Sequence, residues 1–156
     1  MKILYIDPIA NFCKFNLEYY HGFYNAIKRN HEVILINDLN NIIIPDKTEL
    51  IIFGLAVSKK GYLDGFYKRT LKCIQDFQGP KICFVLCLQH LSEKIAWMQR
   101  HAITHIFCES YKTKQLFRNI PASRLLFATN SYEPRKTKKT IDIGFSGALH
   151  LSLIHI

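Results

Sequence analysis

The sequence lacks any long hydrophobic run. Its longest strongly apolar stretch, residues 82–88, is far shorter than the roughly 20 residues that span a bilayer. At the start of the chain, Met1-Lys2 is followed by a short apolar run and then by Asp7-Pro8, which is too short for the apolar part of a cleaved leader. We therefore expect a soluble, cytoplasmic protein.

Paired cysteines are also lacking. The five cysteines are odd in number and form no Cys-x-x-Cys motif. Cys83, Cys87 and Cys108 lie in apolar, strand-like runs, where a free thiol behaves as a small hydrophobe. A chain of 156 residues fits one ordinary domain, which buries roughly 70% of its unfolded surface and needs no disulfide or metal to fold. We expect reduced thiols and no disulfides.

Acidic residues are scarce beside basic ones. The chain has 12 acidic and 21 basic residues, and its formal net charge is +9. Such a surplus favours an anionic partner, whether a nucleotide, a phospholipid headgroup or a nucleic acid. The basic residues are scattered over predicted helices rather than stacked in one stripe with exposed aromatics, which disfavours nucleic acid. Peripheral contact with an anionic membrane stays open.

Several nucleotide-binding and hydrolase motifs are missing. The first predicted strand is not followed by G-x-G-x-x-G, which argues against dinucleotide binding in this domain. The chain has no P-loop motif and no G-x-S-x-G elbow. Gly54 stands at the end of the third predicted strand, where a phosphoacceptor receiver would need an acidic residue.

What the sequence does contain is a repeated unit of a short apolar run and an amphipathic stretch. The runs are continuous rather than alternating, as expected for strands that helices cover on both faces. This pattern predicts an α/β fold with a Rossmann-like parallel sheet and helices on both faces. The predicted strands are Lys2–Ile6, Glu32–Ile36, Leu50–Phe53, Ile82–Cys87, Ile103–Cys108 and Leu125–Ala128.

Helices are expected between these strands, because apolar residues recur there every three or four positions. Ser110 is the predicted cap of the last helix. Residues 38–49 show no helical pattern. The apolar positions of the four helices are Leu17, Tyr20, Tyr24 and Ile27; Leu63, Phe66, Thr70 and Ile74; Leu91, Ile95 and Met98; and Leu116, Phe117 and Ile120.

The character of the chain changes after Ser131. Residues 1–132 form the predicted α/β domain, and residues 133–140 form a polar, basic linker broken by a proline. Residues 141–150 read as a further strand with a Gly-x-x-Gly turn, which is how a second domain would open. We expect that second domain to be truncated.

The last six residues have an unusual possible origin. Residues 151–156 can be encoded by a transposon end that is used in sequencing-library adapters. We expect the natural sequence to depart from this one near His150, so that the tail carries no functional weight. The alternative is a genuine short apolar C-terminus.

Candidate site residues follow from the rule that open α/β sheets bind ligands outside the carboxyl ends of their strands. Asp7, His90 and Glu109 are the side chains there that can accept a proton. The alternatives are that Asp7 only shapes a turn with Pro8 and that Glu109 only favours the start of the next helix. Candidate contacts to a substrate in the same cleft are Asn11, Ser58, Gln89, Ser110 and Asn130.

Three other groups have a structural explanation that we prefer. The spacing of His101, His105 and Cys108 resembles that of metal ligands, but His105 and Cys108 have opposite parity on a strand, so we predict no metal site. The aromatic residues of segment 19–24 fit core packing better than a stacking platform for sugars or bases. The basic run 135–139 fits a solvated linker better than a phosphate site.

Three segments resemble glycosyltransferases of the GT-B type, in the group 1 and spore-protein-like set. They are the opening Met-Lys-Ile-Leu-Tyr-Ile-Asp, the helix and strand of residues 91–107, and Ile-Asp-Ile-Gly-Phe-Ser-Gly-Ala-Leu-His at 141–150. The resemblance covers the amino-terminal domain and the first strand of the donor-binding half. Many relatives have an acidic residue just after the fourth strand, whereas this chain has Gln89 and His90.

The resemblance implies transfer of a sugar from a nucleotide-sugar donor to an acceptor held by the amino-terminal domain. No bound metal or other cofactor is implied. Gly144, Ser146 and Gly147 would form part of the loop that holds the donor phosphates. Without the rest of the donor half, this chain is expected to be inactive. The competing hypothesis is a stand-alone Rossmann-like module that binds nucleic acid or an anionic membrane.

Overall fold

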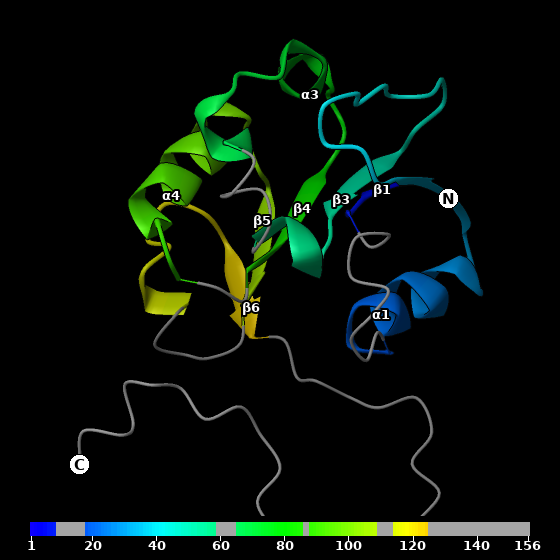
Figure 1. Ribbon diagram of the computed structural model, residues 1–156, viewed down its shortest axis with the longest axis horizontal. Coiled ribbons are helices and arrows are strands. Elements are labelled where there is room, and N and C mark those ends of the chain that lie inside the picture. The colour runs from blue at the N-terminus through cyan, green and yellow to red at the C-terminus, as the bar shows by residue number, and fades with distance from the viewer. Residues whose placement is uncertain (9–17, 59–64, 86–87, 109–113, 125–156) are drawn as a thin grey trace, which may run out of the picture.

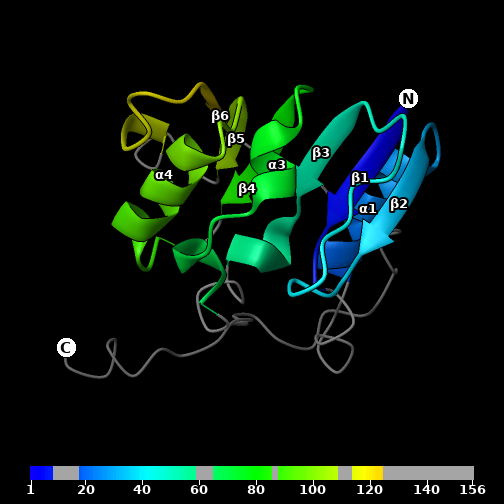
Figure 2. The ribbon, with the colours of Figure 1, turned by 90° about the horizontal axis from the view of Figure 1, so that it is seen from above.

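The computed structural model describes residues 1–8, 18–58, 65–85, 88–108 and 114–124. These residues form one six-stranded sheet in which every pair of neighbouring strands is parallel, in the order β2-β1-β3-β4-β5-β6 (Figures 1 and 2). The predicted Rossmann-like α/β fold is confirmed. The strands are β1 (Lys2–Ile6), β2 (Glu32–Ile36), β3 (Leu50–Phe53), β4 (Lys81–Val85), β5 (His105–Cys108) and β6 (Ala122–Arg124).

The predicted strand limits hold best for the first three strands, which lie at one side of the sheet. β1, β2 and β3 have the predicted bounds, and β4 begins one residue earlier than predicted. β5 begins two residues later, after Ala102 takes a positive φ of 51° at the turn that precedes it. The sixth strand begins three residues earlier than predicted, at Ala122, and the predicted residues 125–128 lie outside the described residues. This edge strand carries polar Ser123 and Arg124, so it has no apolar run to mark it.

Helices lie on both faces of the sheet (Figure 2). One face is covered by α1 (Glu18–Lys28). The other is covered by the 3₁₀ helix η2 (Phe66–Lys68), by α3 (Lys72–Asp76) and by α4 (Leu91–Arg100). Among the described residues, no helix is both long and apolar enough to cross a membrane.

The core on the α4 face is built around the indole of Trp97. This fully buried ring meets the rings of Phe53 and Phe66 with centroids 5.1 and 5.0 Å apart. The Tyr67 ring lies 5.6 Å away, and the His101 imidazole stacks on the indole at 4.3 Å. The indole therefore joins β3, η2 and the end of α4 in one packed unit.

The core on the α1 face contains Phe23 and Tyr24, two aromatic residues of segment 19–24. The Tyr24 ring packs edge-on against Tyr5 of β1 at 5.6 Å, and Phe23 packs against Phe84 of β4 at 5.4 Å. Both α1 side chains are half-buried against the sheet, as core packing predicts. The side chains of Tyr19 and Tyr20 lie outside the described residues.

The helix predicted over residues 63–74 is wrong, because η2 and α3 are separate and the backbone between them is extended. Tertiary contacts oppose a continuous helix at this break. The Arg69 guanidinium donates to the carbonyl oxygen of Leu39 and, at 3.0 Å, to the side-chain oxygen of Asn40. The Leu71 N–H donates to Nε2 of His101 at 2.9 Å instead of continuing a helical ladder.

The remaining predictions have mixed outcomes. Residues 38–49 contain no helix, as expected. Residues 114 and 115 are helical, but 116–120 are not, so the predicted helix does not reach Ile120. Phe117 and Ile120 are nevertheless buried, whereas Leu116 is exposed. Ser110, the linker, the strand at 141–150 and the tail all lie outside the described residues.

Replacing His101 with phenylalanine should destabilise the protein by about 1–3 kcal/mol. Phenylalanine can still stack on Trp97, but it leaves the Leu71 N–H without its acceptor. Urea unfolding at pH 8 measures the loss, and His31→Gln, an exposed change, is the control. Equal stability of wild type and His101→Phe would show that this hydrogen bond does not hold the break between η2 and α3.

Candidate functional site

The candidate site lies where β1 ends. The chain runs from β1 to β2 on one side, while β3 pairs on the other side of β1, so the strand order reverses here. A reversal of this kind opens a crevice at the carboxyl ends of the strands, and α/β folds bind ligands there. Asp7 is the first residue after β1, and its N–H donates to the Ile36 carbonyl oxygen at 2.9 Å. The backbone therefore fixes Asp7 at this position.

The Asp7 carboxyl group is fully buried. Its Oδ2 accepts a hydrogen bond from the Ala56 N–H at 3.3 Å, while its Oδ1 has no hydrogen-bond partner within the described part of the chain. Burial raises the pKa of Asp7 from 3.8 to about 7, against the opposing effect of the Ala56 hydrogen bond. The group can thus gain or lose a proton near neutral pH, and its Oδ1 lacks a hydrogen-bond partner among the described residues although it is shielded from solvent.

Gly54, at the end of β3, makes room for this carboxyl group. A Cβ atom on Gly54 would lie 2.0 Å from Asp7 Oδ2 and 2.7 Å from its Cγ. No side chain fits in that space. The space that a side chain at position 54 would fill is thus taken by the Asp7 carboxyl group, which follows β1.

Tyr5 lies two residues before Asp7 on the same face of β1. It is fully buried, and its hydroxyl has no hydrogen-bond partner among the residues that the structure describes. Burial and the nearby Asp7 charge both raise the pKa of Tyr5, so the phenol keeps its proton. Buried polar groups in proteins normally have hydrogen-bond partners. Near the end of β1, two buried polar groups lack full hydrogen bonding among the described residues.

His90 and Gln89 are exposed in the turn before α4, and they are not part of the Asp7 environment. β3 lies between β1 and β4, so the strand spacing of about 4.8 Å puts the ends of β1 and β4 about 10 Å apart. Ser58 is fully buried in the helical turn after Gly54. Asn11, Glu109, Ser110, Asn130, Gly144, Ser146 and Gly147 lie outside the described residues.

The histidines that suggested metal spacing serve the fold. Both ring nitrogens of His101 are used, since Nε2 accepts from Leu71 and Nδ1 donates to the Trp97 carbonyl oxygen at 2.8 Å. His105 packs beside Phe107 on one face of β5, whereas Cys108 belongs to the core on the other. Within the described ranges, no group of three or more histidine, cysteine, aspartate or glutamate side chains could hold a metal ion.

Sequence reasoning missed Lys94, a fully buried lysine in the first turns of α4. Its Nζ lies 5.7 Å from the centroid of the Tyr67 ring, within range of a cation–π interaction. The signal was present, since Lys94, Trp97, Met98 and His101 follow the spacing of a buried helical face and all four are buried. The apolar face predicted for this helix passed through Leu91 and Ile95 and did not include Lys94.

Gly54→Ala should destabilise the protein by about 1–3 kcal/mol, because the new methyl group and the Asp7 carboxyl group need the same space. Urea unfolding of Gly54→Ala, Asp7→Ala and the double variant forms a thermodynamic cycle. The alanine at 54 should cost less when Asp7 is already truncated, with a coupling of about 0.5–3 kcal/mol. Strict additivity would contradict the contact.

Asp7→Asn should alter how stability depends on pH. The folded pKa exceeds the unfolded one, so the wild-type free energy of unfolding should fall as pH rises from about 4 to about 7. The asparagine variant lacks this fall, and by pH 8 it should gain up to about 4 kcal/mol relative to wild type. Urea unfolding at pH 4.5, 6 and 8 measures the difference, with exposed Asp76→Asn as the control. A constant difference between Asp7→Asn and wild type would contradict the raised pKa.

Comparisons with known proteins give no match for this chain. No family model matches it, and it is not detectably similar to any curated protein or solved structure.

Proposed function

We propose that this chain carries the acceptor-side domain of a GT-B-type glycosyltransferase, which moves a sugar from a nucleotide-sugar donor to an acceptor. The observation that carries the proposal is the buried Asp7 carboxyl group, with one unpartnered oxygen, at the strand-order reversal of a Rossmann-like sheet. The resemblance of three sequence segments to that family supports it. No bound metal is part of the proposal.

Asp7 is the proposed proton acceptor. As the acceptor hydroxyl attacks the anomeric carbon, a new carbon–oxygen bond forms and the bond from sugar to diphosphate breaks. The hydroxyl proton passes to Oδ1 of Asp7, the oxygen that the Ala56 N–H does not occupy. A base whose pKa is about 7 suits this role, because general-base catalysis is most effective when the pKa lies near the working pH.

The donor would be held elsewhere in the complete enzyme. Gly144, Ser146 and Gly147 are the proposed start of its phosphate loop, and the departing diphosphate would be stabilised by backbone N–H groups and basic side chains. The 156-residue chain by itself is therefore expected to transfer no sugar.

The experiment begins with the gene. Its source DNA is sequenced past codon 150 from an internal primer, without a transposon library, and the encoded protein is expressed. Release of nucleoside diphosphate is measured with UDP-glucose, UDP-N-acetylglucosamine and GDP-mannose. Asp7→Asn should lower kcat by about 10²–10⁴-fold with little change in KM, whereas Asp76→Asn should retain wild-type turnover.

Two results would overturn the proposal. One is a reading frame that ends naturally after Ile156, since no donor half would then exist. The other is wild-type turnover in Asp7→Asn. Sugar transfer by the purified 156-residue chain would contradict the expected need for a second half.

A further inference from the structure

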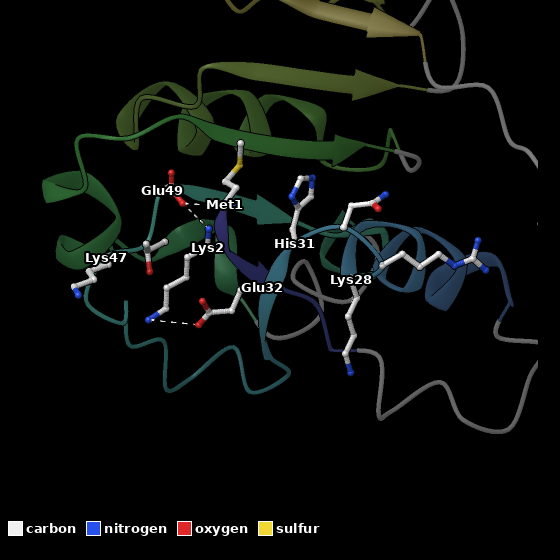
Figure 3. A pocket seen from close by; sticks show the side chains of 10 residues that line it. Met1, Lys2, Lys28, His31, Glu32, Lys47 and Glu49 are labelled. Atoms are coloured by element: carbon white, nitrogen blue, oxygen red, sulfur yellow. Dashed lines mark hydrogen bonds and ion pairs between the residues drawn. The ribbon is translucent and has the colours of Figure 1, made fainter.

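A concave surface lies at the amino ends of β1, β2 and β3, at the end of the sheet opposite Asp7 (Figure 3). Its volume of about 670 Å³ is in the range of small-molecule sites. Since β1 advances about 3.3 Å per residue, this basin lies about 16 Å from Asp7. The residues that line the basin are Met1, Lys2, Lys28, Arg29, Asn30, His31, Glu32, Lys47, Thr48 and Glu49.

The two acidic side chains of the basin already have cationic or N–H partners. Glu32 Oε1 lies 3.8 Å from Lys2 Nζ. Glu49 Oε2 accepts a hydrogen bond from the Lys2 N–H at 2.6 Å and lies 3.9 Å from the Met1 amino group. The basin therefore has little negative charge that could repel an anion.

Three basic side chains of the basin remain without an ion pair among the described residues: Lys28, Arg29 and Lys47. Lys28 and Lys47 stand on opposite sides of the basin, with the Lys2–Glu32 pair between them (Figure 3). The position of Lys28 and Arg29 at the end of α1 already favours cations, because the helix dipole is negative there. That effect does not account for Lys47, which comes from the segment between β2 and β3.

The basin is held by backbone hydrogen bonds. The Glu32 N–H donates to the Met1 carbonyl oxygen at 3.1 Å, and the Glu49 N–H donates to that of Lys2 at 2.9 Å. The Thr48 N–H and hydroxyl both donate to the Pro45 carbonyl oxygen, at 3.3 and 2.6 Å, which closes a turn around Lys47. Lys47 has a left-handed φ of 62°, an unfavourable backbone conformation for a lysine. The turn thus fixes the backbone from which the exposed Lys47 side chain extends.

We propose that this basin binds a ligand with several phosphate charges, either a soluble di- or triphosphate or the phosphate headgroup of a lipid. Cations on two sides of a concave surface suit a group whose oxygens point in several directions, and arginine and lysine are the usual phosphate partners. A single carboxylate is too small to contact the cations on both sides of the basin. The inference does not depend on glycosyl transfer, because the basin and Asp7 share no residue and lie at opposite ends of the strands.

Calorimetric titration of the 156-residue chain with sodium tripolyphosphate tests this inference. Lys28→Gln/Lys47→Gln should weaken binding at least tenfold. The matched control, Lys114→Gln/Arg118→Gln, removes the same charge from exposed positions outside the basin and should stay within twofold of wild type. Equal weakening in both double variants would overturn the site, because the attraction would then come from net charge alone.

A second arm identifies the source of the phosphate. Sedimentation with phosphatidylcholine vesicles, with and without phosphatidic acid, measures lipid binding by the same three proteins. Phosphatidic-acid binding that only the basin variant loses assigns the site to a lipid headgroup, whereas tripolyphosphate binding without vesicle binding assigns it to a soluble phosphate. Failure of wild type to bind either probe overturns the proposal.

Discussion

The pairing of β1 with strands on both sides is the constraint on which the rest of the structure depends. Its register with β2 and β3 sets the two cores, because alternate β1 residues face α1 and α4. The same pairing places Asp7 beside Gly54 at the carboxyl ends of the strands. At the amino ends of the strands, the same pairing brings together the first residues of β1, β2 and β3, and with them the cations of the basin. Both sites are therefore products of one register, and a slip of one residue would abolish both.

Much of the fold could be predicted because buried parallel strands need continuous apolar runs. β1, β2 and β3 follow such runs and were placed correctly. The start of β6 was expected three residues too late, because its backbone pairing with β5 holds a segment whose polar Ser123 and Arg124 give no apolar signal. The helix expected over residues 63–74 failed for another reason. Its periodicity is real, but the contacts of Arg69 and Leu71 with distant segments outweigh the local helical preference.

The candidate site could be predicted only in part. The rule for open α/β sheets selects Asp7 from the sequence, yet it selects His90 equally, and the structure leaves His90 exposed in the turn before α4. Burial is what separates the two, and burial comes from neighbours distant in sequence, such as Ala56. The basin at the amino ends of the strands gave no local signal, because Lys28, Arg29 and Lys47 come together only through the order of the strands. The helical spacing places Lys94 on the same face as Trp97 and Met98, but a lysine is ordinarily expected to be exposed to solvent.

The close approach of Gly54 and Asp7 also has an evolutionary consequence. The ends of β1 and β3 share a volume that admits one side chain, since even a methyl group on Gly54 would overlap the Asp7 carboxyl group. A side chain at position 54 and the Asp7 carboxyl group cannot both be accommodated without a shift of backbone. A related protein with an acidic residue in place of Gly54 would therefore need a smaller residue in place of Asp7. Positions 7 and 54 should therefore change together in evolution, because a protein that carries both side chains would be destabilised by their overlap.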